Sequence, residues 1–367
     1  MLWKACKKKQ KVMPGEARFF YFAFFCSLSV SFSFNLEQRH SGENVYAILR
    51  APRAASTEAV VFSAPYRLDD SLHGSTLPGI ALMVALAKYF RGQGSWAKDI
   101  IFLVTEHELV GFQAWLDAYH DVHTAPGVID PGILAARSGP IQAAINLELH
   151  SSRIKRLDVK LVGLNGQLPN LDLFNLVAEL CLRESVHITF HDQVSPYDVE
   201  TFEGWLQSFK TMTAMMAAQA TGQPNGGHGL FHRYAIQALT LEGHADGAAS
   251  VTVGFDEVGR VLEGVFSSLN NLLERFHQSF FFYLLPSTRR YVSIGLYSPA
   301  FALVGLPALI KVSIDLPVRE KATSLAPYFV LAARVLRGPL LPRRGLCAFL
   351  TSHASHRSRV PALKDHL

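Results

Sequence analysis

The strongest constraint on the fold is a series of apolar runs of strand length, separated by segments with helical periodicity. The runs are AVVFSAP (59–65), KDIIFLV (98–104), IQAAINLEL (141–149) and YAIQALTLEG (234–243). Continuous apolar runs of this length are typical of strands buried on both faces. Strands that alternate with helices indicate an α/β fold. We therefore expect a three-layer sandwich around a mixed, mostly parallel sheet.

The segments between these runs carry helix features. LPGIALMVALAKYF (77–90) has apolar residues at helical spacing, starts near a proline and ends before Gly92. VGFQAWLDAYHD (110–121) and NLDLFNLVAELCLRE (170–184) are further expected helices. SVSFSF alternates serine with apolar residues from residue 29, which predicts a strand with one buried face.

Composition divides the chain into five predicted segments, namely 1–28, 29–257, 258–286, 287–316 and 317–367. The first joins a lysine-rich stretch to FFYFAFFCSL and resembles a signal peptide or signal anchor. The second is the α/β domain. The third has apolar residues at three- and four-residue spacing, which predicts a long amphipathic helix.

The two last segments concern the membrane. YVSIGLYSPAFALVGLPALI (291–310) is twenty residues without charge, a length that suits one transmembrane helix, and the alternative is a buried hairpin. Residues 317–367 form a basic tail without a coherent pattern. Basic ends beside apolar runs favour a membrane surface over nucleic acid, and no nucleic-acid-binding signature accompanies them.

Several chemistries are excluded by missing motifs. The four cysteines are scattered without a CxxC pair, so they form neither a disulfide framework nor a zinc ribbon. There is no GxSxG nucleophile elbow and no GxxxxGK[ST] phosphate loop.

Acids and histidines gather instead at the ends of the expected strands. In α/β sheets, ligands bind at the carboxyl ends of parallel strands, and carboxylates and imidazoles are the ligands of hydrolytic metals. The residues at these ends are Asp69, Asp70, Glu106, His107, Glu108, Glu148 and His150, with His228 and His232 before the last strand.

Thr105-Glu106-His107-Glu108 allows three interpretations. It could belong to an active metallopeptidase or amide-forming enzyme that uses Glu106 as general base. It could hold a single residual metal together with Glu148 and a late histidine, His228 or His244. It could also mark a degenerate pocket, which we favour. It is not the HExxH motif, because Gly111 follows His107 at the fourth position. For HGLFH (228–232), a glycine-rich loop with exposed histidines is favoured over a ligand pair.

The arrangement resembles the di-zinc aminopeptidase fold, and that resemblance implies specific positions. Glu106 matches the general base, and His107 stands where a second glutamate would bind metal. Glu148 fits an aspartate position with one more methylene, and His228 is a candidate for the late histidine.

Two ligands implied by that fold are missing. No histidine stands two residues before Asp69 or Asp70, and Ser75 occupies the position of the bridging carboxylate. Two divalent cations need a bridging carboxylate, which serine cannot supply. We therefore expect no bound metal, no cofactor and no catalytic residue in this chain.

Several long stretches resemble the glycosylphosphatidylinositol (GPI) anchor attachment protein family over roughly residues 29–310. The stretches are GENVYAILRAPRAASTEAVV (42–61), KDIIFLVTEHELVGFQAWLDAYHDV (98–122), GLNGQLPNLDLFNLV (163–177), HGLFHRYAIQALTLEG (228–243) and LNNLLERFHQSFFFYLLP (269–286). The resemblance implies a non-catalytic subunit of the GPI transamidase, with a degenerate peptidase-like domain.

The same resemblance implies a location and partners. The chain would lie in the endoplasmic reticulum membrane with its main domain luminal, beside a caspase-like cysteine-protease subunit. It would help to present the GPI lipid for attachment to the carboxyl end of a proprotein. Both ends of the chain depart from the family pattern, so we expect a truncated or variant form.

Overall fold

The computed structural model describes residues 28–35, 39–67, 74–124, 127–195, 200–245, 252–276 and 281–315. The chain divides into two compact units, the first ending at Tyr291 and the second starting at Val292. The predictions for the amino-terminal segment before Leu28 and for the tail 317–367 lie outside the described residues.

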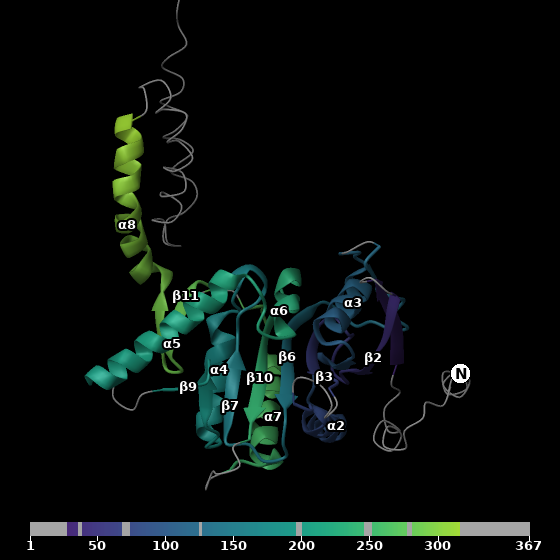
Figure 1. The fold of residues 1–367 in the computed structure, drawn as a ribbon. Coiled ribbons are helices and arrows are strands. Elements are labelled where there is room, and N and C mark those ends of the chain that lie inside the picture. Colours follow the sequence, from purple (N-terminus) through teal and green to yellow (C-terminus); the bar gives the residue numbers. More distant parts are fainter. Residues whose placement is uncertain are drawn as a thin grey trace, which may run out of the picture. The chain divides into compact units, whose positions relative to one another are not determined.

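A ten-stranded sheet forms the centre of the first unit (Figure 1). In spatial order its strands are β5 (Ile129–Asp130), β1 (Leu28–Asn35), β2 (Arg39–Leu49), β4 (Asp99–Thr105), β3 (Ala59–Pro65), β6 (Ile141–Leu149), β10 (Gln237–His244), β7 (Arg156–Lys160), β8 (Ile188–Phe190) and β9 (Gln193–Val194). The four apolar runs of the sequence are therefore adjacent central strands.

The sheet is mixed, as expected, and its parallel part is the central block. β4, β3, β6 and β10 run parallel, with Phe62 of β3 opposite Phe102 of β4 and Ile145 of β6. The pairs of β1 with β2, β2 with β4 and β10 with β7 are antiparallel. The carboxyl ends of the four central strands consequently share one edge.

Helices cover both faces of the sheet, which makes three layers. The helices of the first unit are α2 (Leu77–Arg91), α3 (Glu108–His120), α4 (Leu171–Arg183), α5 (Phe202–Thr221), α6 (His228–Phe231) and α7 (Phe255–Asn271). Successive strand residues point to opposite faces. Val61 packs in one cluster with Trp115 of α3, whereas Phe62 contacts Phe266 of α7 with ring centroids 5.0 Å apart.

The long amphipathic helix is shorter than predicted. The expected helix over 258–286 corresponds to α7, which starts at Phe255 and ends at Asn271. Tyr283–Ser287 is a strand, β11, which pairs with β12 (Arg290–Ser293). The run FFFYLLP has no charge, and aromatic and branched residues suit a strand as well as a helix.

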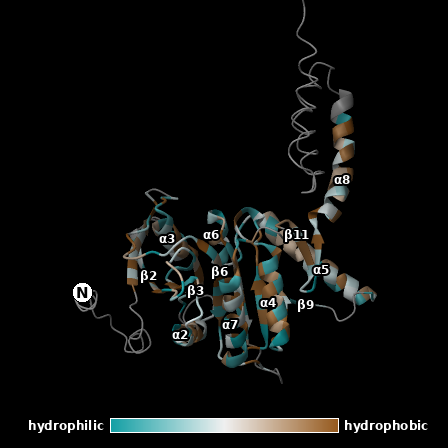
Figure 2. Ribbon diagram, turned by 180° about the vertical axis from the view of Figure 1, so that it is seen from behind, coloured by the Kyte–Doolittle hydropathy of each residue, from teal (hydrophilic) through white to brown (hydrophobic). Residues whose placement is uncertain are grey.

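One apolar helix of the second unit has the features of a membrane span. α8 (Ile294–Asp315) continues through Pro299 and Pro307, and its apolar window Ile294–Lys311 is long enough to cross a bilayer. Its large side chains are exposed, including Val304 at 80%. Figure 2 shows brown, apolar residues along its length. This exposure argues against the buried hairpin.

Candidate functional site

The carboxyl ends of β3, β4, β6 and β10 border a polar pocket of about 430 Å³. Parallel strands bring the residues that follow them to one edge of the sheet. The charged residues that line the pocket are Arg67 after β3, Glu108 at the start of α3, Glu148 and His150 at the end of β6, Lys160 of β7 and Glu242 of β10.

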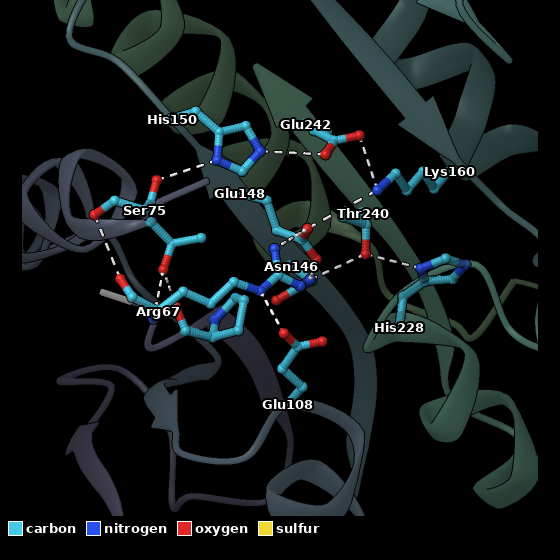
Figure 3. Close-up of polar contacts among 12 residues, drawn as sticks. Arg67, Ser75, Glu108, Asn146, Glu148, His150, Lys160, His228, Thr240 and Glu242 are labelled. Carbon is cyan, nitrogen blue, oxygen red and sulfur yellow. Dashed lines mark hydrogen bonds and ion pairs between the residues drawn. The ribbon is translucent and has the colours of Figure 1, made fainter. Parts of the chain in front are cut away.

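Arg67 occupies the centre of the acidic side (Figure 3). Its Nε donates to Glu108 Oε1 at 2.8 Å, and its Nη1 donates to Glu148 Oε2 at 3.0 Å. Burial opposes the charge of Arg67, but attraction to Glu148 and Glu108 outweighs it and raises the pKa of Arg67. Its side chain is only 12% exposed, and charge-assisted bonds of this kind are strong away from water.

The backbone around Arg67 is held by the start of α2. The backbone N–H of Arg67 donates to Thr76 Oγ1 at 3.0 Å, and that hydroxyl donates to the carbonyl of Pro65 at 2.5 Å. Thr76 is fully buried. The guanidinium is therefore aimed from a fixed strand end rather than from a free loop.

Glu148 is buried and held by a polar chain that reaches across the sheet. Asn146 Nδ2 donates to Glu148 Oε1 at 2.9 Å and to Thr240 Oγ1 at 3.0 Å. Thr240 Oγ1 is 2.8 Å from His228 Nδ1. Burial, and then the nearby His232, lower the pKa of His228 well below its usual value. His228 is thus a neutral core residue that supports the strands.

On the other side of the pocket, the cationic group of Lys160 and the ring of His150 face Glu242. Lys160 Nζ lies 2.8 Å from Glu242 Oε2, and His150 Nε2 donates to Glu242 Oε1 at 3.2 Å. Burial opposes ionisation of Glu242, but its bonds to His150, His244 and Lys160 hold its pKa well below the usual range.

The surroundings of His150 favour its positively charged form. Its Nδ1 faces the backbone carbonyl of Ser75 at 3.1 Å, while its Nε2 faces the carboxylate of Glu242. Both partners only accept hydrogen bonds, so a ring that is protonated on both nitrogens satisfies both contacts. The hydrogen bond to Glu242 raises the pKa of His150 against the effect of burial. Three cationic side chains therefore meet three carboxylates in the pocket.

Some of the predicted site residues belong to the hydrogen-bond network of the pocket, whereas Glu106 and His107 lie outside the pocket. Ser75, Glu148 and His228 belong to the network, Ser75 through its backbone carbonyl and a 3.4 Å hydrogen bond from its hydroxyl to the carbonyl of Arg67. Asp69 and Asp70 lie outside the described residues.

Glu106 and His107 point away from the pocket. Glu106 Oε2 accepts the backbone N–H of Glu43 in β2 at 2.8 Å. The ring of His107 lies against Phe32 and Phe34 of β1, with centroids 6.2 and 5.3 Å apart. Neither residue lines the pocket, so the general-base position predicted for Glu106 is not supported by its geometry.

A local reversal of the backbone explains this placement. His107 and Glu108 both have positive φ, 57° and 47°. Two successive left-handed residues redirect the chain before α3 and turn Glu108 toward Arg67. Gly111 allows the close turn, because an added Cβ there would lie 1.9 Å from the carbonyl oxygen of Glu106. Sequence reasoning assumed a simple strand end.

The histidines of HGLFH are also not in the predicted environment. His228 is fully buried and His232 is 8% exposed, so the expectation of exposed loop histidines was wrong. His232 Nε2 lies 2.9 Å from the carbonyl oxygen of Ala238. The two rings lie within the layer that packs on the sheet.

The residues of the pocket do not fit a divalent metal. Within the described ranges, no group of three or more His, Cys, Asp or Glu side chains gathers as a metal site. Each pocket carboxylate already faces Arg67, Lys160 or His150. A metal would have to displace these fixed cations.

Sequence reasoning missed the three residues that define the pocket charge, Arg67, Lys160 and Glu242. Arg67 directly follows AVVFSAPY and occupies the position, two residues before Asp69, at which a histidine ligand was expected. A basic side chain at a former ligand position can replace the positive charge of a metal, and this would have indicated that Arg67 pairs with Glu148.

Known proteins match most of the described part of the chain. The model of the Gaa1-like family, GPI transamidase component, matches residues 41–324. The chain belongs to the Gaa1-like family. The GPI transamidase component gaa1 of Schizosaccharomyces pombe is 35% identical over 270 residues, which cover 72% of this chain and 45% of that protein. GAA1 of Saccharomyces cerevisiae is 33% identical over 287 residues, 75% of this chain and 43% of that protein.

The family predicted from the sequence stretches is thus confirmed. The alignments span less than half the length of these two relatives. Among solved structures, a zinc aminopeptidase of Bacillus subtilis matches with a TM-score of 0.38 at 11% identity, over 63% of this chain and 52% of that chain. A glutaminyl cyclase of an Acidobacteriales bacterium matches with a TM-score of 0.43 at 10% identity, over 73% and 91%.

Proposed function

We propose that this Gaa1-like chain is a non-catalytic subunit of the GPI transamidase. It would act as a scaffold that helps to present the GPI lipid in the endoplasmic reticulum membrane, with its α/β domain luminal. The caspase-like cysteine-protease subunit would supply the nucleophile. α8 would anchor the chain in the bilayer, because its length and exposed apolar surface suit a span.

The charge-paired pocket is the observation that carries the non-catalytic role. Hydrolysis with a metal needs an open coordination position and a free carboxylate to take a proton from water. Glu108, Glu148 and Glu242 are instead engaged by Arg67, Lys160 and His150. The retained carboxylates thus support the fold around the pocket rather than a bound metal.

Co-purification tests the subunit role. The full chain with an affinity tag is expressed in cells, and solubilised in a mild detergent from endoplasmic reticulum membranes. We expect the caspase-like subunit to co-purify with it. Recovery of the folded chain without any transamidase subunit would overturn the proposal.

Metal content tests the pseudo-peptidase role separately. The purified chain is analysed for zinc after incubation with zinc and removal of the unbound ion. We expect well below about one equivalent, since structural and catalytic zinc sites retain theirs. The variant Glu148→Gln is compared with Glu179→Gln, an exposed carboxylate of α4. Stoichiometric zinc that is lost only with Glu148→Gln would contradict the proposal.

A further inference from the structure

Helix α5 exposes an apolar stripe that no contact within the described chain covers. Phe202, Trp205 and Phe209 are 75%, 53% and 45% exposed, and their rings stack on one another. Leu206 and Met216, 36% and 37% exposed, extend the row. Spacings of three, four and seven residues place these side chains on one face of a helix.

The face of α5 that packs on the protein is the less apolar one. Its buried residues are Gly204, Ser208, Thr211 and Met215, which recur at three and four. Apart from Met215, small and hydroxyl side chains therefore lie inward, while the large aromatic side chains lie outward. The charged residues of α5, Glu203 and Lys210, fall between the two faces. A large exposed apolar surface of this kind indicates an interaction site.

Two contacts tie α5, and the segment that precedes it, to β11 and to Thr288, the residue that follows β11. α5 packs on β11, where the backbone N–H of Leu285 donates to Met215 Sδ at 3.2 Å. Ahead of α5 in the sequence, Ser195 Oγ accepts the N–H of Thr288 at 2.9 Å. Ile294, the first residue of α8, follows Thr288 by six positions (294 − 288). Six residues of extended chain span at most about 20 Å.

We propose that the aromatic stripe of α5 lies in the lipid–water interface of the bilayer. This rests on the proposed role of α8 as a membrane span. β11, on which α5 packs, is followed by α8 after a short stretch of chain, so the same unit that carries the stripe leads directly into the proposed span. Tryptophan and phenylalanine are the side chains that favour this interface, and a helix can bury an apolar face there by about 5–10 Å. The absence of charge on the stripe favours lipid over a polar protein surface.

Trp205 is a natural probe for this contact. The chain has four tryptophans, of which Trp96 and Trp115 are 4% and 0% exposed. The full chain is reconstituted in phosphatidylcholine vesicles with plain or acyl-brominated lipid. Bromine quenches tryptophan fluorescence only at contact range. We expect brominated lipid to quench the wild-type emission, and Trp205→Phe to lose most of this lipid-dependent quenching.

Two further variants separate the possible failures. Phe202→Ser/Phe209→Ser should shift the emission of Trp205 to the red, whereas Lys210→Ser, on the flank of α5, should not. Leu303→Trp places a probe on α8. If Leu303→Trp is quenched by lipid but Trp205 is quenched only by aqueous iodide, the interface proposal is wrong and α8 still spans. If neither is quenched by lipid, α8 is not a span. Protection of Trp205 from both quenchers would mean that a protein covers the stripe, which also overturns the proposal.

Discussion

Helices α5 and α7 have similar lengths and bury opposite kinds of surface. α7 turns its large apolar side chains to the sheet, with Phe266 against Phe62 and Phe90 at 5.0 and 5.7 Å. α5 buries mostly small and hydroxyl side chains, together with Met215, and exposes Phe202, Trp205 and Phe209. The apolar periodicity of a helix therefore does not by itself indicate whether its apolar face packs on the core or is exposed. The charged pocket is like α7 in that its side chains find their partners within the chain: its carboxylates pair with Arg67 and Lys160.

The largest effect is expected from Phe266→Ala. Phe266 is 1% exposed, so truncation should leave a cavity and reduce the free energy of unfolding by about 3–5 kcal/mol. Thermal unfolding of the full chain in detergent measures this loss. A loss as small as that of Phe209→Ala, on the exposed face of α5, would break the distinction between the two helices.

The next effect concerns Arg67→Met, which should destabilise the chain by about 3 kcal/mol, because it removes the nearer of the two cations that face the buried carboxylate of Glu148 and leaves only Lys160, at 3.9 Å. Arg67→Met/Glu148→Gln removes the unpaired charge as well and should recover part of the loss. Denaturant unfolding of both variants tests the pair. Equal losses in the single and double variants would mean that Arg67 acts through packing alone.

A smaller effect is expected from pH through His228. Burial lowers the folded-state pKa of His228. The stability that depends on neutral His228 is therefore fully present above the unfolded pKa of about 6.5 and is lost as pH falls through the folded pKa. Below pH 6.5 this amounts to at most about 1.4 kcal/mol per pH unit. His228→Gln should make unfolding less sensitive to acid between pH 6.5 and 5. His232, whose pKa is also lowered by burial, should keep a residual slope.

His150 is expected to give stability a pH dependence of the opposite sign. Its folded-state pKa is raised by Glu242, so its stabilisation is complete below pH 6.5 and is lost as pH rises through the raised value. His150→Gln should therefore leave the acid slope unchanged and flatten the slope above pH 6.5. A change of the acid slope in His150→Gln would contradict this assignment.

The smallest effect on folding is expected from Phe202→Ser/Phe209→Ser. Exposed side chains away from special contacts usually change stability by less than about 0.5 kcal/mol per substitution. The free energy of unfolding in detergent should therefore stay close to that of the wild type, although the lipid contact of Trp205 changes. A loss of several kcal/mol would show that the stripe packs within the chain and is not a free surface.

Sequence reasoning located most of the sheet because buried parallel strands leave a simple pattern. AVVFSAP, KDIIFLV and IQAAINLEL became β3, β4 and β6 with nearly the predicted ends. α5 was missed, because the inward face of FEGWLQSFKTMTAMMAAQAT carries a glycine, a serine, a threonine and only one large apolar residue, Met215. The end of α7 was misplaced, because an apolar run such as FFFYLLP suits helix and strand equally.

The location of the candidate site, at the carboxyl ends of the parallel strands, was predictable from the sequence, but the contacts between its side chains were not. Local sequence indicated that acids and histidines follow the parallel strands, since the order of strands and helices determines that edge. Which carboxylate enters the pocket depended on two left-handed residues, His107 and Glu108, whose conformation has no signature in Glu106-His107-Glu108.

The sequence by itself determined the family, the central strands and the apolar length of α8, because these follow from residue types in order along the chain. Only the tertiary structure decided that Arg67 lies between Glu108 and Glu148, and that the aromatic face of α5 points outward. Both depend on residues far apart in sequence: an ion pair needs three strand ends to converge, and a helix face is exposed only where no other element packs on it.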